Sequence, residues 1–350
     1  MYSKQIYLPD INEGFTPPKR NSYLFVLAAG FEDRTFNILK NIKNNKPSMV
    51  LVIKYKGEGY TNKDTEINEY LLANKIPFSI LEFDRLNPQD FEDSLQDKIT
   101  TLKNYSEIVV DISSMSKLLI MTLIVNMRNI NQPLTIVYTE AKIYLPTEKQ
   151  FQKQKHNKQI GASKLYFQTL DVSSTVTTRN LSSIAMADAP RFLVAFPTFN
   201  EDLLITLFQE FAPNAWLILH GIPHLQKDKW RTEAIKYINR HILAQVTHNQ
   251  QNNISTYEYR EVFDILERCY QQYKLTHKYI VGSPTSKLQA VGVSLFKLFR
   301  QDIQILYPTP KSYLLKQHSR YSGKIHHISF KDFSKYINDL LVARHKIDAA

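Results

Sequence analysis

The stretch that organises this chain is Ser106–Thr122, SEIVVDISSMSKLLIMT. It passes from an apolar run through a serine-rich turn to a lysine, and then into a second, longer apolar run. A short apolar run followed by a polar turn and a longer apolar segment is typical of a buried strand that leads into a packed helix. The stretch therefore predicts one strand–turn–helix step of an α/β protein.

The same order of features recurs in His277–Phe299, HKYIVGSPTSKLQAVGVSLFKLF. The tripeptide Ser116-Lys117-Leu118 of the first stretch matches Ser286-Lys287-Leu288 of the second. Downstream, the pattern Tyr-x-x-x-Lys-x-Tyr-Leu occurs at Tyr138 and again at Tyr307. Features that repeat in the same order indicate internal duplication, so we expect two copies of one α/β unit.

Apolar runs alternate with helical patterns throughout both copies. The expected strands are 23–29, 49–54, 78–83, 108–111 and 134–139 in the first copy, and 192–196, 215–220, 254–259, 278–281 and 303–307 in the second. Strands that alternate with helices favour right-handed βαβ units and a parallel sheet. The predicted fold class is α/β, with two tandem Rossmann-like units, each a mostly parallel sheet flanked by helices. We expect the first unit, with a connecting segment, over 1–183 and the second, with a C-terminal helix, over 184–350.

The composition indicates a globular, basic protein. The chain has 350 residues, of which 43% are hydrophobic, and a formal net charge of +11. Such a charge favours polyanionic partners, namely nucleotides, oligonucleotides or nucleic acid, although a lysine-rich surface without such a partner is the alternative. The only cysteine is Cys269, which excludes an intrachain disulfide. No signal peptide or spanning segment is apparent, so we expect a cytoplasmic protein without a membrane partner.

Two turns are candidates for holding phosphate, because ligands of open parallel sheets bind beyond the carboxyl ends of the strands. Each turn offers backbone N–H groups at a helix start, hydroxyl groups and one lysine. Simple capping of the helix by the hydroxyl groups is the alternative. Neither turn fits the P-loop pattern. The predicted ligands of the two phosphates are Ser113, Ser114, Ser116 and Lys117 in the first copy, and Ser283, Thr285, Ser286 and Lys287 in the second.

The repeated tyrosine–lysine pattern is expected to follow the last strand of each unit. Its lysines would add charge to the same ligand and its tyrosines would stack on bases, unless the tyrosines only pack with a polar tip. The residues concerned are Lys142, Tyr144, Lys311 and Tyr313.

Four charged residues occur only in the first copy and would serve an enzyme. Glu32 and Asp33 at a strand end are candidate acid and base groups or candidate partners of a ribose hydroxyl, and Arg34 is a candidate phosphate contact. An ion pair at the start of the first helix is the alternative. Asp111, at the end of a buried strand, is the carboxylate whose pKa we expect to be most perturbed. The second copy has Gly282 there.

No cofactor or metal is expected. His220 and His224 are four residues apart, but Gly221 and Pro223 lie between them, so they do not share a helix face, and a third ligand is missing. The signatures GxSxG, HExxH and GxGxxG are absent from the sequence.

Taken with the duplicated turns DISSMSK and GSPTSK, the predicted architecture resembles the CARF family of CRISPR-associated sensor domains, and two fused units resemble the SAVED domains of bacterial anti-phage systems. This resemblance implies a cyclic oligonucleotide ligand bound across paired units, and an effector or partner protein in antiviral defence.

The leading hypothesis is a nucleotide- or oligonucleotide-binding sensor that holds ligand phosphates at the turns after the fourth strands. The first alternative is an enzyme acting on a nucleotide or nucleic acid in the first unit. The second is a basic accessory subunit that docks on a nucleic-acid complex.

Overall fold

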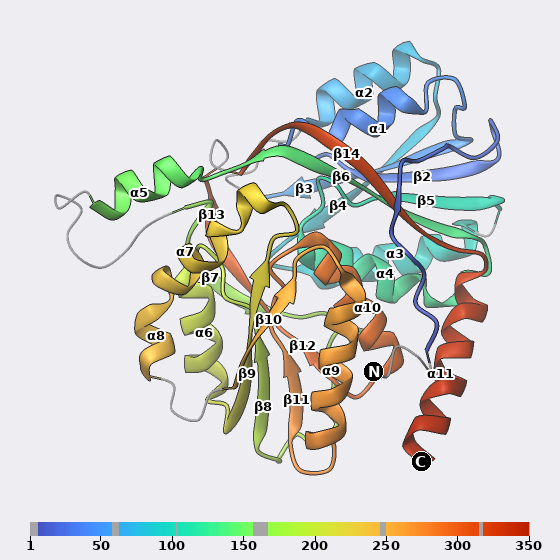
Figure 1. Cartoon of the computed structure of the whole chain (residues 1–350). Coiled ribbons are helices and arrows are strands. Elements are labelled where there is room, and N and C mark those ends of the chain that lie inside the picture. Colours follow the sequence, from blue (N-terminus) through green and yellow to red (C-terminus); the bar gives the residue numbers. More distant parts are fainter. Residues whose placement is uncertain are drawn as a thin grey trace. The chain divides into compact units, whose positions relative to one another are not determined.

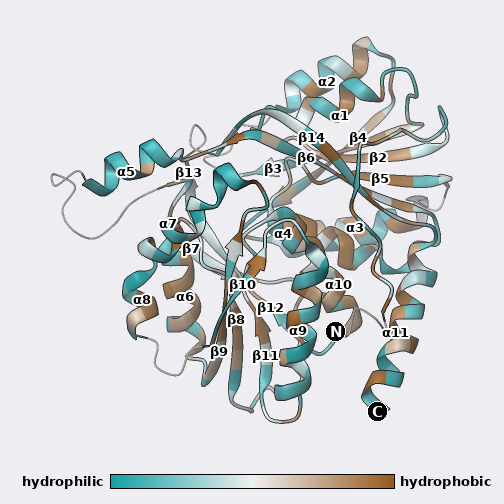
Figure 2. Cartoon of the chain, in the orientation of Figure 1, coloured by the Kyte–Doolittle hydropathy of each residue, from teal (hydrophilic) through white to brown (hydrophobic). Residues whose placement is uncertain are grey.

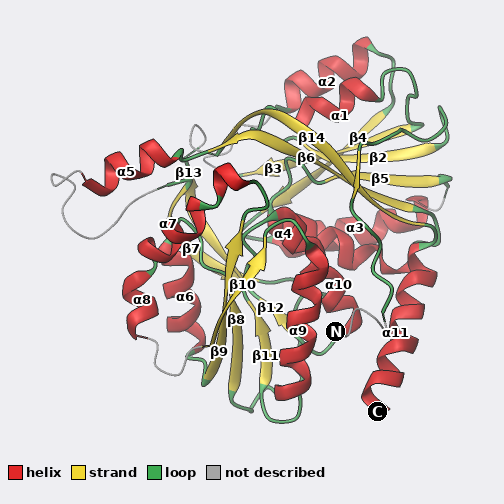
Figure 3. Ribbon diagram, in the orientation of Figure 1, coloured by secondary structure: helices red, strands yellow, loops and turns green. Residues whose placement is uncertain are grey.

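Two main β-sheets, each accompanied by helices, organise the chain (Figures 1 and 3). The structure is a computed structural model that describes residues 6–57, 63–102, 104–156, 167–245, 250–314 and 318–349. The chain divides into two units. The first comprises the N-terminal part as far as Ile143 together with the C-terminal segment from Ser319, and the second is Tyr144–His318.

The first unit contains a seven-stranded sheet in the order β1-β14-β6-β5-β2-β3-β4. The strands from β6 to β4 in that order are parallel. The strands are β1 (Asn12–Glu13), β2 (Tyr23–Ala28), β3 (Met49–Lys56), β4 (Phe78–Asp84), β5 (Glu107–Asp111), β6 (Leu134–Tyr144) and β14 (Ser319–Phe330). The helices are α1 (Thr35–Asn41), α2 (Asp64–Ala73), α3 (Pro88–Leu102), α4 (Lys117–Asn126), the 3-10 turn η2 (Met127–Asn129) and α11 (Phe333–Ala349).

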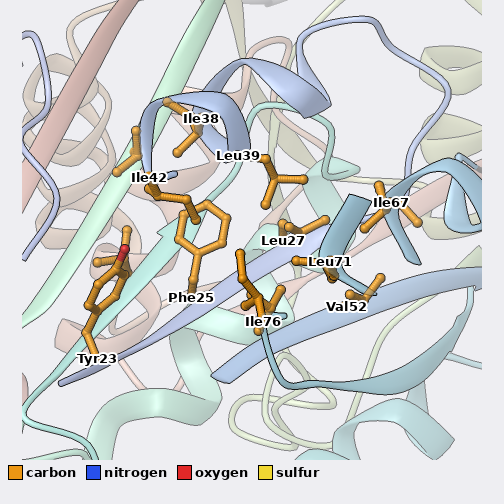
Figure 4. Packing of buried hydrophobic residues seen from close by; sticks show 14 residues of the cluster. Tyr23, Phe25, Leu27, Ile38, Leu39, Ile42, Val52, Ile67, Leu71 and Ile76 are labelled. Carbon is orange, nitrogen blue, oxygen red and sulfur yellow. The ribbon is translucent and has the colours of Figure 1, made fainter. Parts of the chain in front are cut away.

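The core of the first unit follows from its apolar runs. Every residue of β2 is buried, as expected for a central strand covered on both faces. Figure 4 shows Phe25 and Leu27 of β2 with Ile38 and Leu39 of α1 and Leu71 of α2 in one packed cluster. In α4 every residue after its first is buried, so this helix is apolar all round and belongs to the interior.

The second unit contains a five-stranded parallel sheet in the order β10-β9-β8-β11-β12 and a separate antiparallel pair, β13 with β7. The strands are β7 (Thr169–Val176), β8 (Arg191–Ala195), β9 (Ala215–Ile222), β10 (Gln250–Ser255), β11 (Lys278–Val281), β12 (Gln304–Ile305) and β13 (Tyr307–Tyr313). The helices are α5 (Glu148–His156), α6 (Glu201–Phe211), the 3-10 turn η3 (Gln226–Asp228), α7 (Trp230–Ile238), α8 (Arg240–Gln245), α9 (Tyr259–Tyr273) and α10 (Lys287–Phe299).

Both units use the same strand order. In each parallel sheet the first strand is central, the second and third lie on one side of it, and the fourth and fifth on the other. This is the doubly wound, Rossmann-like order, in which the direction of winding reverses between the first and fourth strands. The predicted fold class is confirmed: two mainly parallel sheets flanked by helices.

The bounds of the units differ from the expected division at residue 183. The segment from Ser319 belongs to the first unit because β14 adds to its sheet beside β6. There Thr135 Oγ1 lies 3.1 Å from Ser329 Oγ, while Gly323 lies against Glu140, so β14 runs antiparallel to β6. Residues 144–183 belong to the second unit because β7 pairs with β13 there.

The expectation that the tyrosine–lysine pattern follows the last strand of each unit was wrong for the first unit, whereas in the second unit the pattern does follow β12 but forms a strand of its own. In the first unit β6 continues as a strand as far as Tyr144 and therefore contains the pattern. In the second unit β12 ends at Ile305, and the pattern forms the separate strand β13. The difference arises because each strand gains a pairing partner that is distant in the chain, β14 for β6 and β7 for β13.

Candidate functional site

The carboxyl ends of β2 and β5 lie where the winding of the first sheet reverses, which is the place where such sheets bind ligands. Gly30 follows β2 and Ser114 follows β5. The Ser114 hydroxyl donates a hydrogen bond of 2.7 Å to the carbonyl oxygen of Ala28. A Cβ on Gly30 would come within 2.7 Å of the Ser114 carbonyl oxygen. The two turns are therefore in direct contact, and only glycine fits at this approach.

Asp111 and Ser113 fix the turn after β5. Asp111 Oδ1 accepts hydrogen bonds from the Ser113 N–H, at 2.9 Å, and from the Ser113 hydroxyl. That hydroxyl in turn accepts from the Thr139 N–H of β6 at 2.8 Å. Both Asp111 and Ser113 are fully buried. The hydroxyls of Ser113 and Ser114 thus serve bonds within the protein, and their role toward a phosphate stays a prediction.

Lys117 begins α4, directly after the N-cap residue Ser116. The Ser116 hydroxyl accepts from the Leu119 N–H at 3.2 Å, and the Ser116 N–H donates to the Tyr55 hydroxyl at 2.6 Å. The side chain of Lys117 is partly buried and has no hydrogen-bond or ion-pair partner within the described ranges. Burial lowers the pKa of the Lys117 ammonium from 10.5 to about 8.

This position is electrostatically unusual. The N-terminus of a helix carries a partial positive charge, so a cation there is unfavourable and an anion is favourable. The first turn of α4 contains no acidic residue to balance the lysine. The N–H groups of Lys117 and Leu118 also have no acceptor in the part of the chain that the structure describes. The start of α4 therefore offers two backbone donors and one desolvated cation.

In the matching turn of the second unit, side chains form hydrogen bonds with backbone groups of the protein. Ser286 caps α10 and forms a capping box with Gln289. The Gln289 side-chain oxygen accepts from the N–H groups of Thr285 and Ser286, at 3.1 and 3.0 Å. The hydroxyls of Thr285 and Ser286 donate to the carbonyl oxygens of Pro197 and Thr256.

The remaining predicted residues of this turn differ from their first-unit counterparts. Ser283 is buried, and its hydroxyl donates to the carbonyl oxygen of Pro284 at 3.5 Å. Lys287 is half-buried and has contacts of its own. The equivalent of Gln289 in the first unit is Leu119, which has no such amide, so the N–H groups of Met115 and Ser116 bond instead to the Ile112 carbonyl oxygen and the Tyr55 hydroxyl.

Three of the four charged residues proposed for catalysis lie in one buried network. Arg34 donates to both carboxylate oxygens of Glu32, at 2.8 and 2.9 Å, and to the carbonyl oxygen of Thr139 at 3.0 Å. The Ser319 hydroxyl of β14 donates to Glu32 Oε1 at 2.6 Å. Since the N–H of Thr139 donates to Ser113, which bonds Asp111, the network joins both turns to β6.

This arrangement favours the structural reading of Glu32 and Arg34. The two side chains are 9% and 4% exposed, and a buried bidentate pair needs such additional bonds to offset its desolvation. Asp33, in contrast, is 60% exposed and pairs with Lys63 at 3.1 Å. It does not join the network.

The predicted lysines and tyrosines of the repeated pattern lie on two different strands. Lys142 and Tyr144 lie at the end of β6, where Lys142 is exposed and Tyr144 half-buried. Lys311 and Tyr313 lie on β13, where Lys311 is exposed and the Tyr313 ring is 5.8 Å from the ring of His318. Their contribution to a ligand site stays a prediction.

Sequence reasoning did not identify Tyr55, nor the pairing of Glu140 with His326. Tyr55 directly follows the predicted strand 49–54, at the ligand edge of the sheet, and that position was the available signal. The expected turn after this strand runs as far as Gly59, beyond the described residues, and Tyr55 was not singled out. Glu140 Oε1 lies 3.2 Å from His326 Nε2 of β14, and both side chains are buried. That pair had no sequence signal, because its members are far apart in the chain.

Comparisons with known proteins do not identify a family. No protein-family model and no curated protein matches the chain. One solved structure that matches is the crystal structure of the cytoplasmic domain of a prokaryotic cation chloride cotransporter. It is 10% identical, covers 85% of this chain and 99% of its own, and has a TM-score of 0.26.

Two further findings concern the described residues only. Their histidine, cysteine, aspartate and glutamate side chains form no group of three or more that is suited to a metal ion. None of the helices in those ranges combines the length and apolar character that crossing a membrane requires.

Proposed function

We propose that the first unit binds a phosphate-bearing ligand, a nucleotide or oligonucleotide, at the turn Ile112–Lys117. The observation that carries the proposal is Lys117, a desolvated cation at the first position of an apolar helix. A bound phosphate would offset the repulsion between this lysine and the helix dipole. It would also accept from the N–H groups of Lys117 and Leu118 and from the Ser116 hydroxyl, whose proton is available because the oxygen acts as the helix cap.

The scaffold of this turn supports the proposal. Tyr55 is buried, accepts from the Ser116 N–H and donates toward the Ser114 carbonyl oxygen at 3.4 Å. Ser113 and Ser114 tie the same turn to β6 and β2. A turn that is held in place before the ligand arrives loses little conformational freedom on binding. We therefore propose that Ser113 and Ser114 shape the site, and that Ser116 and Lys117 contact the ligand.

The second unit has weaker support as an equal phosphate site. In the sensor hypothesis both turns contribute, but the hydroxyls of Thr285 and Ser286 donate to carbonyl oxygens of the protein, and Lys287 has contacts of its own. The proposal therefore assigns the principal contact to the first unit. The cyclic form of the ligand and the role in antiviral defence rest on the resemblance of the two turns to CARF and SAVED domains.

The alternative proposal is an enzyme whose site contains Glu32, Asp33, Arg34 and Asp111. It has less support, because Glu32 bonds to Arg34 and Ser319, and Asp111 bonds to Ser113. A general acid or base must lie within hydrogen-bond reach of the substrate group with which it exchanges a proton. The oxygens of these carboxylates already accept hydrogen bonds from groups of the protein.

Thermal unfolding against a panel of mononucleotides, cyclic oligonucleotides and short RNA and DNA tests the proposal. A ligand at 100 times its Kd stabilises the fold by about 2.7 kcal/mol. Lys117→Ala should weaken the binding of the ligand that responds in this panel by roughly 10- to 100-fold, the usual effect of losing a charged hydrogen bond. Lys287→Ala should weaken it less, and Lys40→Ala, at an exposed position of α1, is the control. A panel without any response, or a Lys117→Ala protein that binds as tightly as the wild type, would refute the proposal.

A further inference from the structure

Almost half of the net charge of the chain lies in two segments of the second unit. Helix α5 and residues 226–245 together contain eight lysines and arginines against three acidic residues, a net +5 of the total +11. Lys149, Lys153 and Lys155 of α5 are exposed, as are Lys227 and Lys229 before α7. Figure 2 shows α5 as mostly hydrophilic along its length.

The two segments form one surface because their aromatic side chains pack together. The Phe151 ring of α5 lies 5.8 Å from the Trp230 ring and 6.2 Å from the Tyr237 ring, both of α7. Phe167 and Phe199 complete this buried cluster. We call the exposed side of α5, η3, α7 and α8 the α5–α7 surface.

Aromatic rings hold several of these cations in fixed positions. Lys155 Nζ lies 4.3 Å, and Arg240 Cζ 4.2 Å, from the centre of the Tyr237 ring. Arg231 Cζ lies 4.6 Å from the centre of the Phe199 ring, and its guanidinium donates to the Pro146 carbonyl oxygen at 2.9 Å. Burial lowers the pKa of Arg231 to about 10, so it remains charged at neutral pH. Cations that are held in place lose less side-chain entropy when an anion binds.

We propose that the α5–α7 surface binds the backbone of a single-stranded nucleic acid. Its exposed lysines would contact the phosphates of the strand, and the indole of the half-buried residue Trp230 would stack on a base. Such a combination of charge and aromatic rings is how proteins bind single strands without reading their sequence. This site is independent of the phosphate site proposed for the first unit.

The chemistry of the surface disfavours an anionic membrane as its partner. An interfacial helix inserts large apolar side chains into the lipid, in addition to its electrostatic attraction. Within α5 and residues 226–245, every large hydrophobic side chain that the structure describes is buried or half-buried. Phe151, Ile235 and Ile238 all face the aromatic cluster. The surface therefore offers charge and part of one indole, which suits a nucleic acid better than a bilayer.

Fluorescence anisotropy with a labelled oligothymidylate of about 20 nucleotides tests the proposal on the full chain, since strands of this length cover a complete site. Lys149→Glu/Lys153→Glu should weaken binding at least 10-fold. It should also reduce the slope of log K against log salt by about 1.4, because each lost phosphate contact contributes about 0.7. Lys40→Glu/Lys43→Glu makes the same charge change at exposed positions of the first unit and should alter binding less than twofold.

A second readout tests the stacking contact. The chain has two tryptophans, so Trp216→Phe leaves Trp230 as the only indole. Oligothymidylate should quench its emission, while inorganic polyphosphate, which has no bases, should not. The proposal would be overturned if the Lys149/Lys153 variant and the Lys40/Lys43 variant lost the same affinity for oligothymidylate. It would also be overturned if the protein bound polyphosphate as tightly as oligothymidylate and the oligothymidylate did not quench Trp230, if it bound duplex DNA more tightly, or if it preferred anionic vesicles. Lys117→Ala should leave this binding unchanged, which separates it from the proposed function.

Discussion

Gly30 and Ser114 touch at the point where the winding of the first sheet reverses: a Cβ on Gly30 would lie 2.7 Å from the Ser114 carbonyl oxygen and 2.9 Å from its Cβ. The place where an open sheet usually admits a ligand is therefore occupied by the turns of the protein itself. Consequently, the available donors lie further along the second turn, at Ser116 and Lys117.

Gly30→Ala should destabilise the protein by about 1–3 kcal/mol, because the added methyl group meets backbone that cannot rotate away. Gly221→Ala is the matched control in the second unit. There the nearest atom is a side-chain methyl carbon of Thr256, at 2.8 Å, and not backbone, so the loss of stability should be smaller. Urea unfolding measures both changes. A Gly30→Ala protein with the wild-type midpoint would show that the two turns are not in fixed contact.

The stability of the protein should rise between about pH 8 and 10.5 through Lys117. Its pKa is about 8 in the folded protein and 10.5 in the ordinary state, so the unfolded chain binds more protons across this window. The free energy of unfolding therefore increases with pH there, on the order of 2 kcal/mol when solvent access to the side chain is allowed for. Lys117→Met should remove this rise. Urea unfolding at several pH values compares the two proteins, and parallel pH profiles would contradict the prediction.

Replacing only one residue of the buried ion pair Glu267–Arg300 should lower the free energy of unfolding substantially. Arg300 Nε lies 2.9 Å from Glu267 Oε2, and the two side chains are 0% and 2% exposed. Glu267→Leu removes the carboxylate partner of a buried guanidinium and should cost about 3–5 kcal/mol. Adding Arg300→Met should recover most of this loss. The exposed pair of Lys324 and Glu13 is the control, and breaking it should barely move the unfolding midpoint. A double-mutant cycle without coupling at the buried pair would reject this account.

A fragment comprising Tyr144–His318 should fold on its own, whereas one comprising residues 184–350 should not. The first fragment keeps β7 paired with β13 and contains the complete parallel sheet. The second loses β7 and carries β14 without its partners β6 and β1. Thermal unfolding followed by circular dichroism distinguishes a cooperative transition from a gradual one. A cooperative transition in the second fragment would contradict the division of the chain described above.

Much of the fold was predictable because the central strands are buried on both faces. Runs such as Tyr23–Ala28 are continuously apolar, and each was expected as a strand from its composition alone. The turn that leads into α4 was also predictable, since Ser116 is an effective cap before an apolar helix. In contrast, β7 and β13 contain few apolar residues in sequence, and they exist as a pair because each supplies the backbone partners of the other.

The sequence by itself determined two α/β units and the strand–turn–helix step around Lys117, because composition and local spacing are properties of short segments. Only the tertiary structure decided that β14 returns to the first unit, that Ser114 closes against Gly30, and that the Ser286 hydroxyl donates to the Thr256 carbonyl oxygen while the proton of the Ser116 hydroxyl stays available. The physical reason is that strand pairing, close contacts and side-chain hydrogen bonds depend on residues that are distant in the chain and meet only when it folds.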